Sequence, residues 1–147
     1  MTQHSQSILG ARVMALAIDF ILLVTIHLLL FILLAEKLIQ GTHFDAPALF
    51  TLLILFLLLF SVSFLFLQMT YFTFFHAWSG QTIGKMVMGI RVVTNDNRLI
   101  SPSVAFLRWS GYILSFVPLA IGFLWAAVDK DQCAWHDRLA QTRVIST

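Results

Sequence analysis

The stretch ARVMALAIDFILLVTIHLLLFILLA, Ala11 to Ala35, decides the fold of this chain. At about 1.5 Å of rise per residue it spans roughly 37 Å, enough to cross a hydrocarbon core about 30 Å thick with some tilt. The run nevertheless contains Arg12 and Asp19. A charge at a helix centre opposes insertion by roughly 2.5 to 3.5 kcal/mol, which the many apolar residues outweigh. We predict a membrane-spanning helix whose charges require partners.

The composition excludes an ordinary soluble domain. Of 147 residues, 59% are hydrophobic and 11% are charged, and the mean hydropathy is +0.89, whereas soluble proteins have about 25% charged residues. The net charge of +2 is small and suits an anionic inner leaflet better than a nucleic acid. The single cysteine, Cys133, excludes an internal disulfide and a multi-cysteine metal site. We expect no metal and no cofactor.

A second apolar segment, Ala48 to Phe75, predicts another span that forms an antiparallel hairpin with the first. The loop over residues 79–102 contains Ile83, Met86, Val87 and Ile90 at helical spacing. This spacing predicts a short amphipathic helix on the membrane surface, with Lys85 as its anchor.

A third apolar segment, residues 104–128, precedes a polar tail over residues 129–147. If this segment crosses the membrane, the lysines and arginines near the loops divide 4 to 4; if it returns, they divide 7 to 1. The second division favours a cytoplasmic N-terminus, loop and tail. The segment is therefore either a third span or a re-entrant hairpin bent near Pro118. A tail on the same side would let IRVVT and TRVIS pair as a small sheet.

The predicted fold is an all-α integral membrane protein with one domain over residues 1–147. A transmembrane helical hairpin is joined by the third hydrophobic segment and by small amphipathic and β elements. Since backbone in a re-entrant hairpin must be covered by protein, that alternative requires an oligomer.

Alignment of the two spans by depth predicts partners for the charges. Arg12 and Asp19 lie seven residues apart, on one helix face; alignment places Asp19 level with Gln68. Arg108 enters the third segment at a similar depth, so we expect an Arg12, Asp19, Gln68 and Arg108 cluster. Interhelical hydrogen bonds of this kind contribute about 0.6 to 2 kcal/mol each.

Two interpretations of these polar residues stay open. Arg12 is either an interfacial anchor or a member of the cluster, and Asp19 either fixes helix packing or lines an ion or proton path. His27, which the alignment places level with Ser61, is either a packed polar residue or part of a relay.

Catalytic motifs are not supported. GQTIGKM has one residue too few between its glycines for a phosphate loop, and Met86 replaces the magnesium-binding hydroxyl. The adjacent polar residues of WHDRL do not converge on one atom. We expect no enzyme activity, and we expect Asp137 to tie the tail to an arginine of the second loop.

Three motifs together resemble the RDD family of bacterial membrane proteins: GARVMALAIDF, GQTIGKMVMGIRVV and WHDRLAQTRVI. The family is named for one arginine and two aspartates. The resemblance maps these onto Arg12, Asp19 and Asp137, with Arg138 beside the last. It implies a multi-pass protein of the bacterial inner membrane, with suggested links to transport and to sodium/proton exchange.

Two functions follow as hypotheses. The first is an oligomeric ion or proton transporter or antiporter that uses Asp19. The second is a non-catalytic membrane scaffold or accessory subunit whose charges hold helices together. The expected partners are membrane lipids and either further copies of the chain or another membrane protein, with no nucleic acid.

Overall fold

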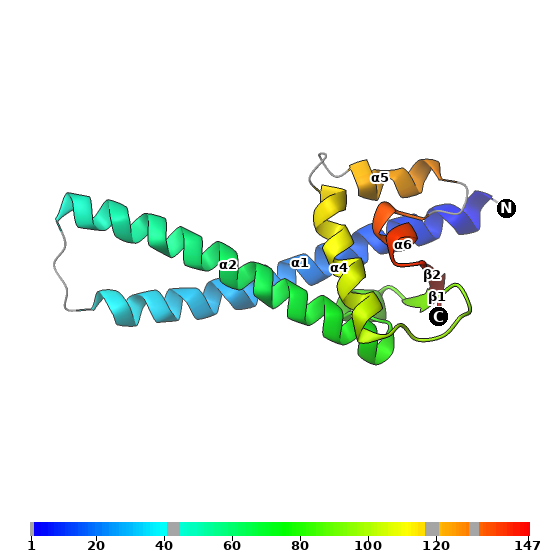
Figure 1. Ribbon diagram of the computed structural model, residues 1–147, viewed down its shortest axis with the longest axis horizontal. Helices are drawn as coiled ribbons and strands as arrows, with labels where there is room; N and C mark the ends of the chain where they lie inside the picture. Colours follow the sequence, from blue (N-terminus) through cyan, green and yellow to red (C-terminus); the bar gives the residue numbers. More distant parts are fainter. Residues whose placement is uncertain (1, 41–44, 117–120, 130–132) are drawn as a thin grey trace. The chain divides into compact units, whose positions relative to one another are not determined.

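The computed structural model describes residues 2–40, 45–116, 121–129 and 133–147 (Figure 1). The elements, in chain order, are α1 (Thr2–Ile39), α2 (Ala46–Ser79), α3 (Ile83–Val87), β1 (Ile90–Thr94), α4 (Pro102–Phe116), α5 (Ile121–Val128), α6 (Trp135–Leu139) and β2 (Thr142–Ser146). The chain forms two compact units. We call Phe20–Gln68 the hairpin unit, and Met1–Asp19 with Met69–Thr147 the loop–tail unit.

Two helices are long and apolar enough to cross a membrane, which confirms that part of the predicted fold. They cover Ile8–Lys37 and Ala46–Ser79. Along the two helices of the hairpin unit many leucines are exposed; Leu30 is 60% exposed and Leu58 is 58% exposed. Leucines exposed to this extent over whole helices are typical of a surface in contact with lipid.

The described residues of the third apolar segment lie in two helices, α4 and α5. α4 has 15 residues and α5 has 8, so they extend about 22 Å and 12 Å, less than the hydrocarbon thickness. Pro118, at the predicted bend, lies outside the described residues. The two helices pack closely, since a Cβ added to Gly122 would lie 2.7 Å from Ser115 Cβ. The side of the membrane that the tail faces stays a prediction.

The loop after α2 forms α3 and β1. Thr82 caps α3 by accepting a hydrogen bond from Lys85 N, which satisfies a backbone donor at the helix start. Met86 and Val87 are exposed, as an amphipathic helix requires, but Lys85 is only 6% exposed. The prediction that Lys85 anchors this helix at the membrane surface is therefore wrong.

β1 and β2 form a two-stranded antiparallel sheet, in which Val92 lies opposite Val144. These strands are the IRVVT and TRVIS segments, and one face of β1 enters a core. Val92, Ile100 and Ala105 are buried there together. Gly80 lies against β1 in a backbone conformation that favours glycine, with a φ of +72°. Its carbonyl oxygen accepts a hydrogen bond from Val92 N at 2.8 Å. A side chain at Gly80 would place Cβ 2.6 Å from Val92 O.

α6 packs beside α4 (Figure 1). Gly111 of α4 permits this approach, because an added Cβ would lie 2.8 Å from His136 Cβ. The start of α6 is held by Asp137, whose Oδ2 accepts from Ala134 N at 3.0 Å. This packing brings the only acidic residue of α6 to the interior of the loop–tail unit.

Candidate functional site

Asp137 joins two arginines from distant parts of the sequence. Its Oδ2 lies 2.9 Å from Arg12 Nη1, and its Oδ1 lies 2.5 Å from Arg108 Nη2. The Asp137 side chain is fully buried and that of Arg108 is 1% exposed. Because each residue belongs to a different helix, this ion triad ties α1, α4 and α6 together.

The triad keeps Asp137 ionised. Burial alone would raise the pKa of Asp137, but the positive charge of Arg108 holds that pKa well below its ordinary value. The neighbouring His136 is also buried, and its burial lowers the pKa of His136 well below the usual range. The carboxylate therefore stays charged and the imidazole stays neutral near neutral pH.

Arg108 has further partners that connect α4 to the strand region. Its Nη1 donates to Thr142 Oγ1 on β2, and its Nε lies 3.4 Å from Tyr112 OH. A buried guanidinium that reaches a carboxylate and two hydroxyls has its donors well used. Removal of any partner would leave part of a buried cation unsatisfied.

Asp19 accepts hydrogen bonds from three donors. Tyr71 OH and Gly84 N reach Oδ1, each at 2.7 Å, and Thr82 Oγ1 reaches Oδ2 at 2.5 Å. Tyr71 OH in turn accepts from Ile83 N at 3.1 Å. The Asp19 side chain is fully buried. The carboxylate thus binds the start of α3 to α1 and α2.

Lys85, on the same short helix, has an unusual partner. Its Nζ lies 3.1 Å from His76 Nε2 and 6.0 Å from the centre of the Phe72 ring. Burial lowers the pKa of the Lys85 ammonium below its ordinary value.

The structure regroups the cluster expected from the sequence. Arg12 and Arg108 both form ion pairs with Asp137 instead of Asp19. Arg12 is therefore a member of an ion cluster and not only an interfacial anchor. Gln68 falls in the hairpin unit, whereas the donors to Asp19 come from residues 71, 82 and 84 of the loop–tail unit.

The prediction that Asp137 pairs with an arginine of the second loop is wrong, and Arg138 does not belong to the ion triad. The arginines on Asp137 come from α1 and α4, not from the second loop. Arg138 pairs with Asp129, and its side chain is 56% exposed. This surface pair is separate from the buried triad.

His27 lies in the hairpin unit among polar and aromatic neighbours. Its Nε2 lies 3.2 Å from Phe60 O and 3.3 Å from Ser63 Oγ. The serine that contacts His27 is therefore Ser63, two residues after the expected Ser61. The rings of Phe31, Phe60 and Phe64 surround the imidazole. These contacts agree with a packed polar residue between α1 and α2.

We expect His27→Phe to lower the stability of the helix pair by about 1 kcal/mol, because one interhelical hydrogen bond is lost while the ring volume is kept. Unfolding in a denaturing detergent series measures the change. Ser61→Ala is the matched control, since Ser61 Oγ donates only within its own helix, to Leu57 O. An equal loss in both variants would contradict the interhelical role of His27.

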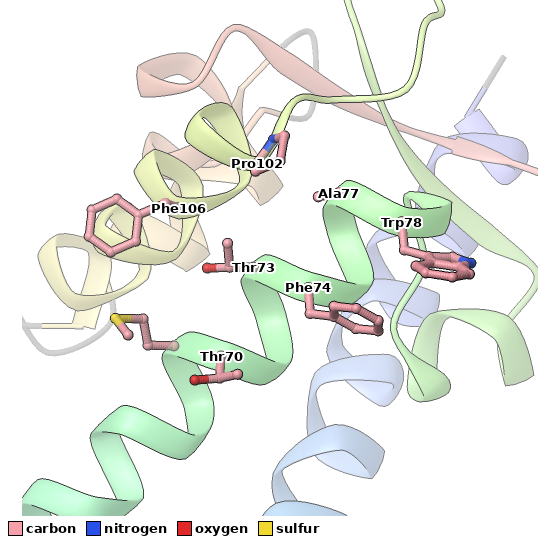
Figure 2. A pocket seen from close by; sticks show the side chains of 8 residues that line it. Thr70, Thr73, Phe74, Ala77, Trp78, Pro102 and Phe106 are labelled. Carbon is pink, nitrogen blue, oxygen red and sulfur yellow. The ribbon is translucent and has the colours of Figure 1, made fainter.

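Two recesses open on the loop–tail unit. The first, of about 510 Å³, is an apolar groove along α2 and α4 (Figure 2), lined by Met69, Thr70, Thr73, Phe74, Ala77, Trp78, Pro102 and Phe106. Figure 2 shows Thr73 on the side of α2 that faces α4. The second, of about 450 Å³, is polar and includes Asp137, Arg138 and Arg143 in its wall.

The sequence profile of the RDD family matches residues 7–141. The chain belongs to the RDD family. YxaI, an uncharacterized protein of Bacillus subtilis (strain 168), is 33% identical over 64 residues, which are 44% of this chain and 42% of that protein. The match thus spans less than half the length of this relative, and no solved structure matches.

In this RDD protein, the residues mapped onto the family's arginine and aspartates all lie in the loop–tail unit. Arg12 and Asp137 contact one another directly, whereas Asp19 has its own set of donors. The two carboxylates therefore form two separate connections inside one unit.

Proposed function

We propose that this RDD protein is a non-catalytic membrane accessory or scaffold protein whose buried charges hold the loop–tail unit together. The observation that carries the proposal is the occupancy of both carboxylates. Asp19 faces three hydrogen-bond donors, and Asp137 lies between two guanidinium groups. A carboxylate that binds a metal cation must instead direct free oxygen lone pairs at it.

The proposed location is the bacterial inner membrane, with the N-terminus, the second loop and the tail in the cytoplasm. The 7 to 1 division of basic residues supports this orientation. The short lengths of α4 and α5 also support a third segment that returns to its starting side. In this orientation the basic loop and tail would face anionic lipid headgroups and a membrane partner.

An oligomeric ion or proton transporter is the second candidate. One observation favours it: the buried Lys85 and His76 side chains lie within hydrogen-bond distance of each other. Both are groups that can gain or lose a proton, and proton relays in membranes use such residues. Further copies of the chain would be needed to enclose a path.

Asp19→Asn separates the two candidates. The new amide NH₂ would face a hydrogen-bond donor, so we expect a loss of about 2 kcal/mol in unfolding free energy. Wild-type protein in proteoliposomes should show no sodium-dependent proton flux above that of empty vesicles. Thermal unfolding and a pH-sensitive dye measure the two quantities.

Asp45→Asn is the matched control for this experiment. Asp45 is exposed and caps α2 through Ala48 N at 3.0 Å, and asparagine caps helices as well as aspartate does. Its stability should be unchanged. A wild-type flux that Asp19→Asn abolishes without loss of stability would refute the accessory role and favour transport.

A further inference from the structure

The arginines of the loop–tail unit fall into two groups. In the first group each is paired with a carboxylate: Arg12 and Arg108 with Asp137, and Arg138 with Asp129. In the second group no carboxylate of the described residues lies within salt-bridge distance. The arginines of this second group are Arg91, Arg98 and Arg143. Their positive charges are therefore not compensated by the described part of the chain.

Two arginines of the second group lie on one face of the sheet. Arg91 and Val93 point to the same side of β1, because side chains alternate along a strand, and Val93 lies opposite Arg143 on β2. Each guanidinium donates to a neutral amide oxygen. Arg91 reaches Gln81 at 3.3 Å, and Arg143 reaches Asn97 at 3.0 Å. These amides bond the guanidinium groups without balancing their charge.

The sheet lies at the end of the second membrane-spanning helix. α2 is long and apolar enough to cross a membrane and ends at Ser79, next to Trp78, which is 73% exposed. An exposed tryptophan at a helix end is typical of the membrane–water interface. Gly80 follows directly, and its carbonyl oxygen accepts from Val92 N of β1 at 2.8 Å. β1 therefore lies close to the depth of the lipid headgroups.

The apolar groove between α2 and α4 begins at this same end of α2. Trp78 and Pro102 line one end of the groove, and Met69 and Phe106 line it further along the two helices (Figure 2). From Trp78 back to Met69 the groove follows about 13 Å of α2, at 1.5 Å per residue. Its walls are apolar and lie on a membrane-spanning helix, so they suit the acyl chain of a lipid.

The Arg91 side chain lies near the Trp78 end of the groove. A Cβ added to Gly80, two residues after Trp78, would lie 3.0 Å from Arg91 Cγ and 3.4 Å from Leu99 Cδ2. Leu99 in turn is three residues before Pro102. Uncompensated positive charge and an apolar groove thus occur together at headgroup depth.

We propose that an anionic phospholipid binds here, with one acyl chain in the groove and its phosphate beside Arg91. Arg98 and Arg143, both exposed, add positive charge around that phosphate. Asp96, in the turn before Arg98, is exposed and lies beyond salt-bridge distance of all three arginines. The proposal rests on the membrane location in the proposed function, and lipid binding can fail while the stability and flux results expected of that function hold.

Native mass spectrometry of the full-length protein in a neutral detergent tests the proposal, with phosphatidylglycerol and phosphatidylcholine of identical acyl chains as probes. We expect wild type to bind phosphatidylglycerol at least about tenfold more tightly. Arg91→Gln should reduce this preference about fivefold, the factor that one basic residue near an anionic surface contributes. Arg138→Gln is the matched control and should keep the preference, because Arg138 already pairs with Asp129.

Thr70→Phe tests the acyl chain separately from the headgroup. Thr70 is exposed on the groove wall, and a phenylalanine there would fill part of the groove. Binding of both lipids should weaken by about fivefold or more, with the preference for phosphatidylglycerol retained. Soluble glycerol phosphate at millimolar concentration should not displace bound phosphatidylglycerol, since it has no acyl chain.

Four results would overturn the proposal. They are equal binding of the two lipids by wild type, an equal loss of preference in Arg91→Gln and Arg138→Gln, undiminished binding in Thr70→Phe, and displacement of the lipid by glycerol phosphate. Should Arg91→Gln fail to fold, Arg143→Gln, whose side chain is exposed, replaces it with the same expected loss.

Discussion

Asp137→Asn should lower the free energy of unfolding by about 3 to 5 kcal/mol, the range measured when one partner of a buried ion pair is removed. The reason is Arg108, whose side chain is 1% exposed and would lose its counter-charge. Arg12, 15% exposed, would lose the same partner. A loss of this size leaves little folded protein, so the amount recovered from membranes and the unfolding transition both report it.

Asp129→Asn is the matched control for Asp137→Asn. Asp129 also pairs with an arginine, and its side chain is only 9% exposed, but Arg138 is 56% exposed and water can take over its bonds. An asparagine oxygen can still accept the bond from Cys133 N that Asp129 Oδ2 accepts. We expect a change of at most about 1 kcal/mol, as for other surface ion pairs. Equal losses in the two variants would show that burial of Asp137 does not determine its contribution.

Gly84→Ala should cost about 3 kcal/mol or more, through overpacking and the loss of a hydrogen bond to a charged group. The added Cβ would lie 2.1 Å from Ala15 O and 3.0 Å from Asp19 Cγ. Since Ala15 O belongs to the α1 backbone, α3 must move away from α1. The bond from Gly84 N to Asp19 Oδ1, now 2.7 Å, would lengthen or break. Unfolding midpoints measure the effect.

Gly10→Ala, a substitution on α1, provides the opposite expectation. A Cβ at Gly10 meets nothing within 4 Å, and alanine favours a helix over glycine by up to about 1 kcal/mol. This variant should be as stable as wild type or slightly more stable. A destabilised Gly10→Ala beside an unaffected Gly84→Ala would refute the contact between α1 and α3.

The two long helices follow from the sequence because continuous apolar runs leave few alternatives. Residues 11–35 and 48–75 lie within helices that extend further at both ends. The spacing of Ile83, Met86, Val87 and Ile90 also predicts a helix; the structure contains it as α3, which ends at Val87, whereas Ile90 begins β1. The charged residues to examine, Arg12 and Asp19, stand out because charges are rare in such runs.

The partners of those charges could not be read from the same pattern. Depth alignment considers only the two long helices, whereas the donors Thr82 and Gly84 and the carboxylate of Asp137 come from short segments at and after α3. A five-residue helix has too little periodicity to reveal which side chains face inward. One signal was present: GQTIGK places a hydroxyl beside a glycine at Thr82 and Gly84, which suits close approach to a carboxylate.

The burial of Lys85 was also not predictable from the sequence. A lysine on an amphipathic segment is usually a surface anchor, and only the fold places it beside His76. The approach of α6 to α4 at Gly111 is equally invisible in the sequence, although it is this contact that brings Asp137 to Arg108.

A double-mutant cycle on Arg108 and Asp137 tests most directly whether buried charges hold α4 and α6 together. The four proteins are wild type, Arg108→Met, Asp137→Asn and the double variant, each unfolded under the same conditions. The account predicts a coupling energy of about 2 kcal/mol or more, with the double variant much less destabilised than the sum of the two single changes. Losses that simply add would contradict it.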